Sequence, residues 1–225
     1  MPDAHTQHFG LSTSLMSTLS SRLLVVTDRH QTNGRPLVPL LQRVLTTGVP
    51  MVQLRERDLS AGALMTLARE VQAVTDSRRS QLLINDRIDI ALALEGGGVQ
   101  VRSNSLPVSV ARQLLGAQRL LGVSVHGVEE VMKAESQGAD YLVLGPIYET
   151  PSKRMFGPPL GIHTLEKACR LVRIPIIGIG GVTAARAHEM RRAGAFGVAV
   201  ITAILGAADV ESATRELLDA VTRAP

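Results

Sequence analysis

A histidine ends an apolar run in the segment LLGVSVHGVEE, residues 120–130. An imidazole has an ordinary pKa of about 6.5, so an exposed one at the end of a strand can both take up and release a proton near neutral pH. The alternative is a histidine that only hydrogen-bonds its own loop. The position of His126 favours an acid/base residue.

Two arginines stand two positions apart in the segment MVQLRERD, residues 51–58. Residues at this spacing on a strand point to the same face. Guanidinium groups at the mouth of a site can pair with a carboxylate or a phosphate. We therefore expect at least one of Arg55 and Arg57 to face a substrate. The alternative for Arg57 is a solvated side chain.

An aspartate in the segment INDR, residues 84–87, is a candidate magnesium ligand. The alternative for Asp86 is a salt bridge with Arg55 or Arg87. Magnesium is usually held by one or two carboxylates together with oxygens of the substrate. The next candidate strand end, VQVRSNSLP, supplies no carboxylate, and this weighs against a metal site.

Glycines and a threonine end two further apolar runs, in IGIGGVT (177–183) and GVAVIT (197–202). Glycine lets backbone N–H groups approach phosphate oxygens closely, and the last two loops of a βα barrel commonly bind phosphate. We expect Gly180, Gly181 and Thr202 to form such a site. Tight turns alone are the alternative reason for the glycines.

A long loop rich in glycine and proline, GPIYETPSKRMFGPPLG, spans residues 145–161. Loops of this length in a compact domain are usually lids or binding loops. Thr150, Ser152 and Lys153 are candidates to hold an anionic group there. The alternative is a surface loop without a binding role.

Strands and helices must position these residues, and the chain predicts them as alternating apolar runs and amphipathic segments. The expected strands are 23–28, 51–56, 81–86, 98–101, 120–126, 141–146, 175–181 and 197–202, and the clearest helical segments are 36–48, 61–76, 128–139, 164–172, 184–195 and 209–224. Eight βα units predict an α/β fold, a single-domain (β/α)₈ TIM barrel over residues 21–225, with a doubly wound open sheet as the alternative. Residues 1–20 are expected to form a flexible extension.

Barrel closure would bring the strand ends together at one face, where barrel enzymes place their active groups. The polar residues at these ends are Asp28, Arg55, Arg57, Asn85, Asp86, Gln100, Ser124, His126, Gly180, Gly181 and Thr202. They are the candidate site.

Composition limits the classes of partner. The formal charge is +4, but the arginines are scattered and aromatic residues make up 2% of the chain, so nucleic-acid binding is not expected. A basic balance favours a small phosphorylated substrate. No apolar run is long enough for a membrane span, and the single cysteine, Cys169, rules out an internal disulfide. We expect a cytoplasmic protein, and the helix faces leave open whether it is a homo-oligomer.

Motifs in a fixed order resemble a known family. VTD, VQLRER, INDR, LGVSVH, GADY, GPIYET, SK, PLGI and IPIIGIGGVT are similar to the corresponding segments of the thiamine phosphate synthase and TenI superfamily, over about residues 23 to 205. The resemblance implies a (β/α)₈ barrel that binds a phosphorylated thiazole. It places the thiazole phosphate on Gly180, Gly181, Ile201 and Thr202.

Two activities divide this superfamily. Its synthases couple hydroxymethylpyrimidine diphosphate to thiazole phosphate with the help of Mg²⁺, and its TenI-type tautomerases aromatise a carboxythiazole phosphate by proton transfer without a metal. Compared with the synthase pattern, Gln100 stands for histidine, Arg102 for glycine, Ser103 for glutamine, Ser105 for the second metal-binding aspartate and Arg57 for lysine. Only Asp86 is left for the metal, with weak neutral help from Asn104.

The resemblance to the tautomerase branch, in RER, VQ and YETPSK, leads to the first hypothesis, a metal-independent thiazole tautomerase without a cofactor and with His126 as its acid/base residue. Lys153 or Arg55 would face the substrate carboxylate. The expected substrate-binding residues are Arg55, Asn85, Gln100, Ser124, Thr150, Ser152 and Lys153. The alternatives are a synthase with Mg²⁺ on Asp86 and a non-catalytic barrel that binds a thiazole phosphate for regulation.

Overall fold

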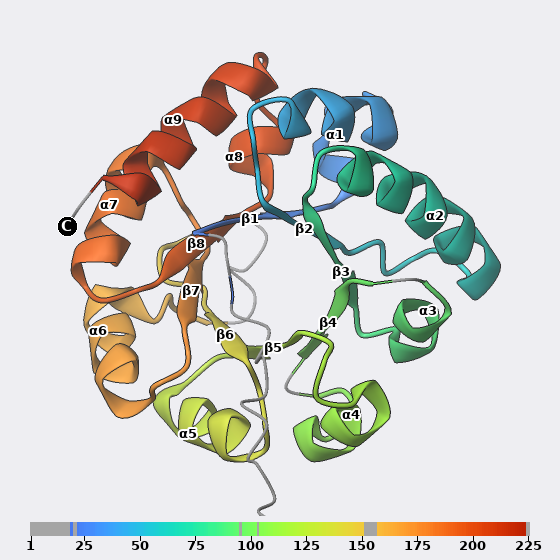
Figure 1. Ribbon diagram of the computed structural model, residues 1–225. Helices are drawn as coiled ribbons and strands as arrows, with labels where there is room; N and C mark the ends of the chain where they lie inside the picture. The colour runs from blue at the N-terminus through green and yellow to red at the C-terminus, as the bar shows by residue number, and fades with distance from the viewer. Residues whose placement is uncertain (1–18, 20–21, 95, 103, 151–156, 224–225) are drawn as a thin grey trace, which may run out of the picture.

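Eight parallel strands form a closed barrel in the computed structural model, which describes residues 19, 22–94, 96–102, 104–150 and 157–223 (Figure 1). The strands pair in chain order, and β8 returns to β1. They are β1 (Leu23–Val26), β2 (Met51–Leu54), β3 (Gln81–Asn85), β4 (Gly98–Arg102), β5 (Leu121–Val125), β6 (Tyr141–Leu144), β7 (Ile176–Ile179) and β8 (Gly197–Val200). The predicted (β/α)₈ barrel and all eight predicted strands are confirmed.

Most of the expected strand ends run one or two residues too far. The residues concerned, among them Arg55, Asp86, His126 and Gly180, come directly after the last paired residue of their strands. Their backbones have already left the sheet, so their side chains stand at the rim of the barrel.

Helices surround the strands as an outer ring in Figure 1. They are α1 (Leu37–Leu45), α2 (Ala61–Ser77), α3 (Ile88–Ala93), α4 (Val108–Leu115), α5 (Val128–Ser136), α6 (Gly161–Leu171), α7 (Ala184–Arg192), α8 (Thr202–Leu205) and α9 (Val210–Thr222), with a short 3₁₀ helix η1 (Arg29–Gln31). The six expected helices are present. The short α3, α4 and α8 were not predicted, because segments of four to eight residues show little helical periodicity.

Two apolar cores result from this arrangement. Strand residues that point outward pack against the helices, and residues that point inward, such as Leu24, Met51, Leu83 and Tyr141, fill the barrel. Leu19, the one described residue of the expected N-terminal extension, is buried in the inner cluster. Among the described residues, no helix is long and apolar enough to cross a membrane.

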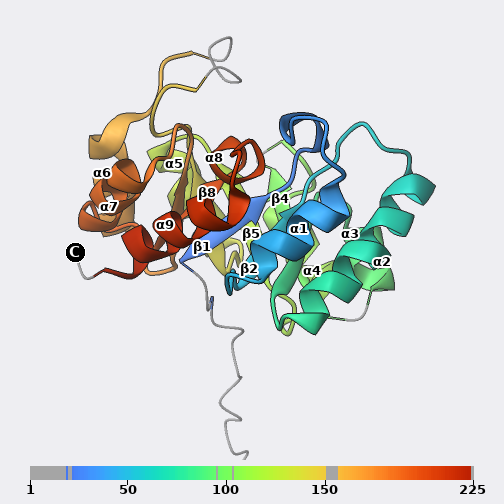
Figure 2. The same ribbon diagram turned by 90° about the horizontal axis from the view of Figure 1, so that it is seen from above.

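The rim at the carboxyl ends of the strands is the end from which the connecting segments rise. Seen from the side in Figure 2, the segments that follow β1, β2 and β6 extend from the same end of the barrel. Parallel closure therefore brings the ends of all eight strands, and the residues that follow them, to one face.

Tyr141 fills part of the inside of the barrel, where its packing depends on a glycine of the neighbouring strand. Its side chain is fully buried, and burial raises the pKa of its hydroxyl above the usual range. Gly122 on β5 leaves it room, because a Cβ at Gly122 would overlap the Tyr141 ring and Oε1 of Gln100. The barrel is thus filled at a position where a neighbouring strand has no side chain.

We predict that Gly122→Ala lowers the free energy of unfolding by about 2 kcal/mol, because the methyl group overpacks the interior. Gly62 lies in α2 with open space around its Cβ position, so the matched variant Gly62→Ala should raise it by about 0.5 kcal/mol. Urea unfolding followed by circular dichroism measures both. Equal stability of the two variants would contradict this packing.

Candidate active site

A cavity of about 370 Å³ lies at this rim and receives residues from all eight strands or the segments that follow them. Predicted site residues that line it are Arg55, Arg57, Asn85, Ser124, His126, Thr150, Gly180, Gly181, Ile201 and Thr202, joined by Arg102. Residues separated by up to about 150 positions in the chain thus meet in one space, as the barrel fold requires.

Other predicted residues lie elsewhere. Gln100 is 1% exposed and lies beneath the cavity, where its Nε2 donates to Oγ of Ser124 over 3.0 Å. Asp28 begins η1, and its carboxylate accepts a hydrogen bond from the backbone of His30. Ser152 and Lys153 lie outside the described residues.

Polar side chains form the floor of the cavity. Nε2 of Gln53 donates to Oδ1 of Asn85 over 3.0 Å, next to the contact between Gln100 and Ser124. These contacts join β2 to β3 and β4 to β5. They give the amide nitrogens of Gln53 and Gln100 an acceptor and fix which way Asn85 and Ser124 point. Gln53 was not predicted as a site residue, although its place as a polar residue within the apolar run MVQL was a usable signal.

His126 is held in a defined orientation. Its Nδ1 lies 2.6 Å from the carbonyl oxygen of Gly145, and its backbone N–H donates to Glu130. A carbonyl only accepts hydrogen bonds, so Nδ1 carries the proton and the neutral ring leaves Nε2 without one. His126 lines the cavity, and Nε2 is therefore suited to accept a proton there.

The buried carboxylate of Glu56 determines where the two arginines of RER stand. It accepts a hydrogen bond from Oγ1 of Thr27 over 2.7 Å and one from Nη1 of Arg29 over 3.2 Å. Oγ1 of Thr27 also accepts from the backbone N–H of Arg55 over 2.9 Å. Glu56 is buried in the protein, while Arg55 and Arg57, on either side of it, line the cavity.

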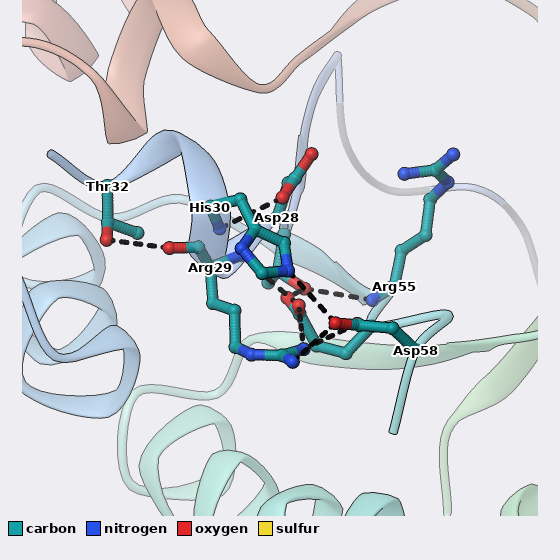
Figure 3. Close-up of polar contacts among 8 residues, drawn as sticks. Asp28, Arg29, His30, Thr32, Arg55 and Asp58 are labelled. Atoms are coloured by element: carbon teal, nitrogen blue, oxygen red, sulfur yellow. Dashed lines mark hydrogen bonds and ion pairs between the residues drawn. The ribbon is translucent and has the colours of Figure 1, made fainter. Parts of the chain in front are cut away.

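Figure 3 shows that Arg29 and Arg55 have different roles in this cluster. Arg29 forms an ion pair with Asp58, and the hydrogen bonds from Arg29 and His30 hold the pKa of Asp58 well below its usual range. The side chain of Arg55 points away from that pair. Arg29 is thus a structural residue, and Arg55 keeps its guanidinium for the cavity.

Positive charge accumulates on this side of the cavity. Burial lowers the pKa of Arg55 from its usual value, and the nearby guanidinium groups of Arg57 and Arg102 lower it further, against the opposite effect of Asp28 and Glu56. Three like charges close together favour an anionic ligand, since an anion relieves their repulsion.

The glycine turn after β7 is tightly enclosed. Gly180 and Gly181 have φ values of 102° and 62°, and a Cβ on either would come within 2.7 Å of Pro146 or of the carbonyl oxygen of Glu149. Arg186 supports the turn, because its Nη1 donates to the carbonyl of Gly181 over 2.8 Å while its guanidinium stacks on the Tyr148 ring. Only glycine fits at these two positions.

The magnesium site implied by the resemblance does not fit the donors. Asp86 forms an ion pair with Arg102, so the expected salt bridge to Arg55 or Arg87 is wrong; Arg87 pairs with Asp89 instead. Ser105 provides no charge at the second position. Among the residues that the structure describes, no group of three or more His, Cys, Asp or Glu side chains could hold a metal ion.

Comparisons with known proteins agree with this architecture. A family model described as thiamine monophosphate synthase matches residues 23–204. A thiamine-phosphate synthase of Roseiflexus castenholzii is 41% identical over 195 residues, covering 87% of this chain and 86% of that protein. One of Moorella thermoacetica is 43% identical over 202 residues, covering 90% and 96%.

A solved structure points the same way. The thiamine phosphate pyrophosphorylase from Pyrococcus furiosus superposes with a TM-score of 0.81 at 32% identity, covering 89% of this chain and 95% of that one. The family match spans the barrel from β1 into α8, which includes every described strand and the whole cavity rim. The chain therefore belongs to the thiamine monophosphate synthase family.

Proposed function

We propose that this protein is a thiamine-phosphate synthase that joins hydroxymethylpyrimidine diphosphate to a thiazole phosphate. The observation that carries the proposal is that one cavity has two regions whose residues are suited to bind anions. Arg55 and Arg57, which follow β2, form a cationic wall with Arg102 at the end of β4, while Gly180, Gly181, Ile201 and Thr202 follow β7 and β8. A cavity built for two phosphorylated substrates needs both.

The order of the strands separates these two regions. In a closed barrel of eight strands, β4, which ends at Arg102, lies across the barrel from β8, and β2, which Arg55 and Arg57 follow, is three strands away from β7. The arginines and the glycine turns therefore approach a ligand from different sides. The names and the 41% and 43% identities of the relatives support the synthase over the tautomerase that the resemblance put first.

The residues present suit the coupling chemistry. A new C–N bond forms between the pyrimidine methylene and the thiazole nitrogen, and the C–O bond to the diphosphate breaks. Negative charge grows on the departing diphosphate, where guanidinium donors that are already in place stabilise it. The turns after β7 and β8 would hold the thiazole phosphate through backbone N–H groups. Pyrophosphate and thiamine phosphate are the products.

A thiazole tautomerase remains the second candidate because of one observation. His126 lines the cavity with Nδ1 engaged by Gly145, which leaves Nε2 to move a proton on a bound ring. The same imidazole also fits a synthase as a hydrogen-bonding group to a substrate. The two activities can be measured side by side.

The test of the proposal is formation of thiamine phosphate from the two substrates by the purified full-length chain. Reactions are run with Mg²⁺ and with EDTA, beside a tautomerase assay on the carboxythiazole phosphate. Coupling supports the synthase. Tautomerisation with no coupling under either condition would reject it in favour of the second candidate.

Arg55→Gln should lower kcat/KM for coupling by about 100-fold, because a charged donor to the leaving diphosphate is lost. Arg170→Gln is the matched control, since Arg170 lies on the exposed face of α6 and pairs with Glu166. Steady-state assays that vary the diphosphate substrate measure the effect. Equal rates for the two variants would contradict a role of Arg55 in binding diphosphate.

His126→Asn separates the two candidate activities. Loss of an acid/base residue should lower tautomerase turnover by about 100-fold or more, with little change in KM. Coupling needs no such proton transfer on carbon and should fall much less. His163→Asn, a change at an exposed position of α6, is the control. A tautomerase rate unaffected by His126→Asn would exclude this residue as its acid/base group.

A further inference from the structure

The pair formed by Asp86 and Arg102 occupies the place where the family resemblance puts a metal ion. Asp86 follows β3 with φ at 58°, a backbone conformation that aspartate tolerates better than most residues. Its backbone N–H donates to the carbonyl of Gln100 over 3.0 Å. The carboxylate is thereby turned toward the end of β4, where Arg102 stands.

Both oxygens of this carboxylate accept hydrogen bonds. Oδ1 accepts from the backbone N–H of Arg102 over 3.0 Å, and Oδ2 accepts from Nε of Arg102 and, over 3.3 Å, from Nδ2 of Asn85. A cation at Asp86 would have to displace a guanidinium and then sit beside it. Such an exchange is unfavourable because like charges repel.

Arg102 is held by one edge only. Its Nε binds Asp86, and among the described residues neither terminal nitrogen of its guanidinium, Nη1 or Nη2, has a hydrogen-bonding partner. Its side chain is 41% exposed, against 14% for Asp86, and it lines the cavity. The guanidinium is fixed from behind and presents its other donors to the cavity that Arg55 and Arg57 also line.

Two substitutions relative to the family pattern change the charge of this site by the same amount as a bound divalent cation would. Ser105 removes one negative charge relative to an aspartate, and Arg102 adds one positive charge relative to a glycine. The two changes together alter the site by two units in the positive direction. The backbone N–H of Ser105 donates to the carbonyl of Arg102, so both changes lie close together at the end of β4.

We propose that Arg102, positioned by Asp86, takes the place of the divalent cation and binds the diphosphate of the substrate together with Arg55 and Arg57. The proposal rests on the function proposed above, for which the diphosphate is the leaving group. A guanidinium offers paired N–H donors to phosphate oxygens, which suits a fixed position. Diphosphate binding then needs no metal ion in this protein.

The first test uses inorganic pyrophosphate and the full chain in isothermal titration calorimetry, once in EDTA and once with Mg²⁺. We expect binding in EDTA with a dissociation constant within about threefold of that with Mg²⁺. Binding that appears only when Mg²⁺ is added would overturn the proposal. This comparison uses the unmodified protein and depends on no variant.

Arg102→Gln should weaken pyrophosphate binding in EDTA by at least tenfold, since a charge-assisted contact is lost. Arg87→Gln is the matched control: Arg87 also pairs with an aspartate, Asp89, just after β3, but it is not part of the cavity lining and should leave binding unchanged. Thermal unfolding checks that both variants are folded. Equal binding by the two variants would contradict the assignment of Arg102.

A double variant, Arg102→Gly with Ser105→Asp, restores the family pattern and should make pyrophosphate binding dependent on Mg²⁺. Pyrophosphate binding should fall at least tenfold in EDTA and recover on addition of Mg²⁺, because Asp86 then gains a second carboxylate beside it and loses its guanidinium. Binding that stays independent of Mg²⁺ in this variant would contradict the proposed exchange.

The outcome for Arg102 can be separated from the outcome for the proposed function. Coupling activity together with pyrophosphate binding that requires Mg²⁺ would leave the synthase standing and overturn the role of Arg102. Metal-independent pyrophosphate binding that Arg102→Gln weakens, with no coupling activity, would support the role of Arg102 and overturn the synthase.

Discussion

Closure of eight short parallel strands is the constraint on which the site depends. Each described strand has four or five residues, so the residue after each one reaches the same rim of the barrel. Arg55, His126 and Gly180 face one cavity for this reason, although they belong to three different βα units. The interior that holds the strands apart is mostly apolar and includes Tyr141, for which Gly122 leaves room beside the amide of Gln100.

Beneath the rim, pairs of polar side chains from neighbouring strands fix the directions of the groups above them. Thr27 and Glu56 join β1 to β2, Gln53 and Asn85 join β2 to β3, and Gln100 and Ser124 join β4 to β5. A buried donor left without an acceptor is costly, so each pair allows few alternative orientations. The site is therefore organised before any ligand binds, which favours stabilisation of charge during a reaction.

The sequence predicted the fold and the positions of most cavity residues, because both follow from a repeating pattern. Apolar runs identified all eight strands, and the polar residues or glycines at the ends of most runs identified the rim. Partners across strands were less predictable, since they depend on register. Asp86 was expected to bind a metal or to pair with Arg55 or Arg87, whereas the step from β3 to β4 places it against Arg102. Glu56 likewise lies between two arginines in the sequence, and only the fold shows that it is buried against Thr27.

Family membership and the local charges carry different kinds of information about the chemistry. The match over residues 23–204 describes the whole barrel, while the metal site that the resemblance implies depends on a few positions. Ser105 stands at one of those positions, where the resemblance implies an aspartate, and Arg102 stands nearby in place of a glycine, so both departures change the charge in the same direction. A guanidinium carries half the charge of a divalent cation, but its position here is fixed by covalent attachment and by Asp86, so no ion has to be recruited and dehydrated. The three arginines of the cavity can then supply together the positive charge that one metal ion would concentrate at a point. The proposed reaction thereby keeps diphosphate as its leaving group, and guanidinium groups bind the diphosphate instead of a metal ion.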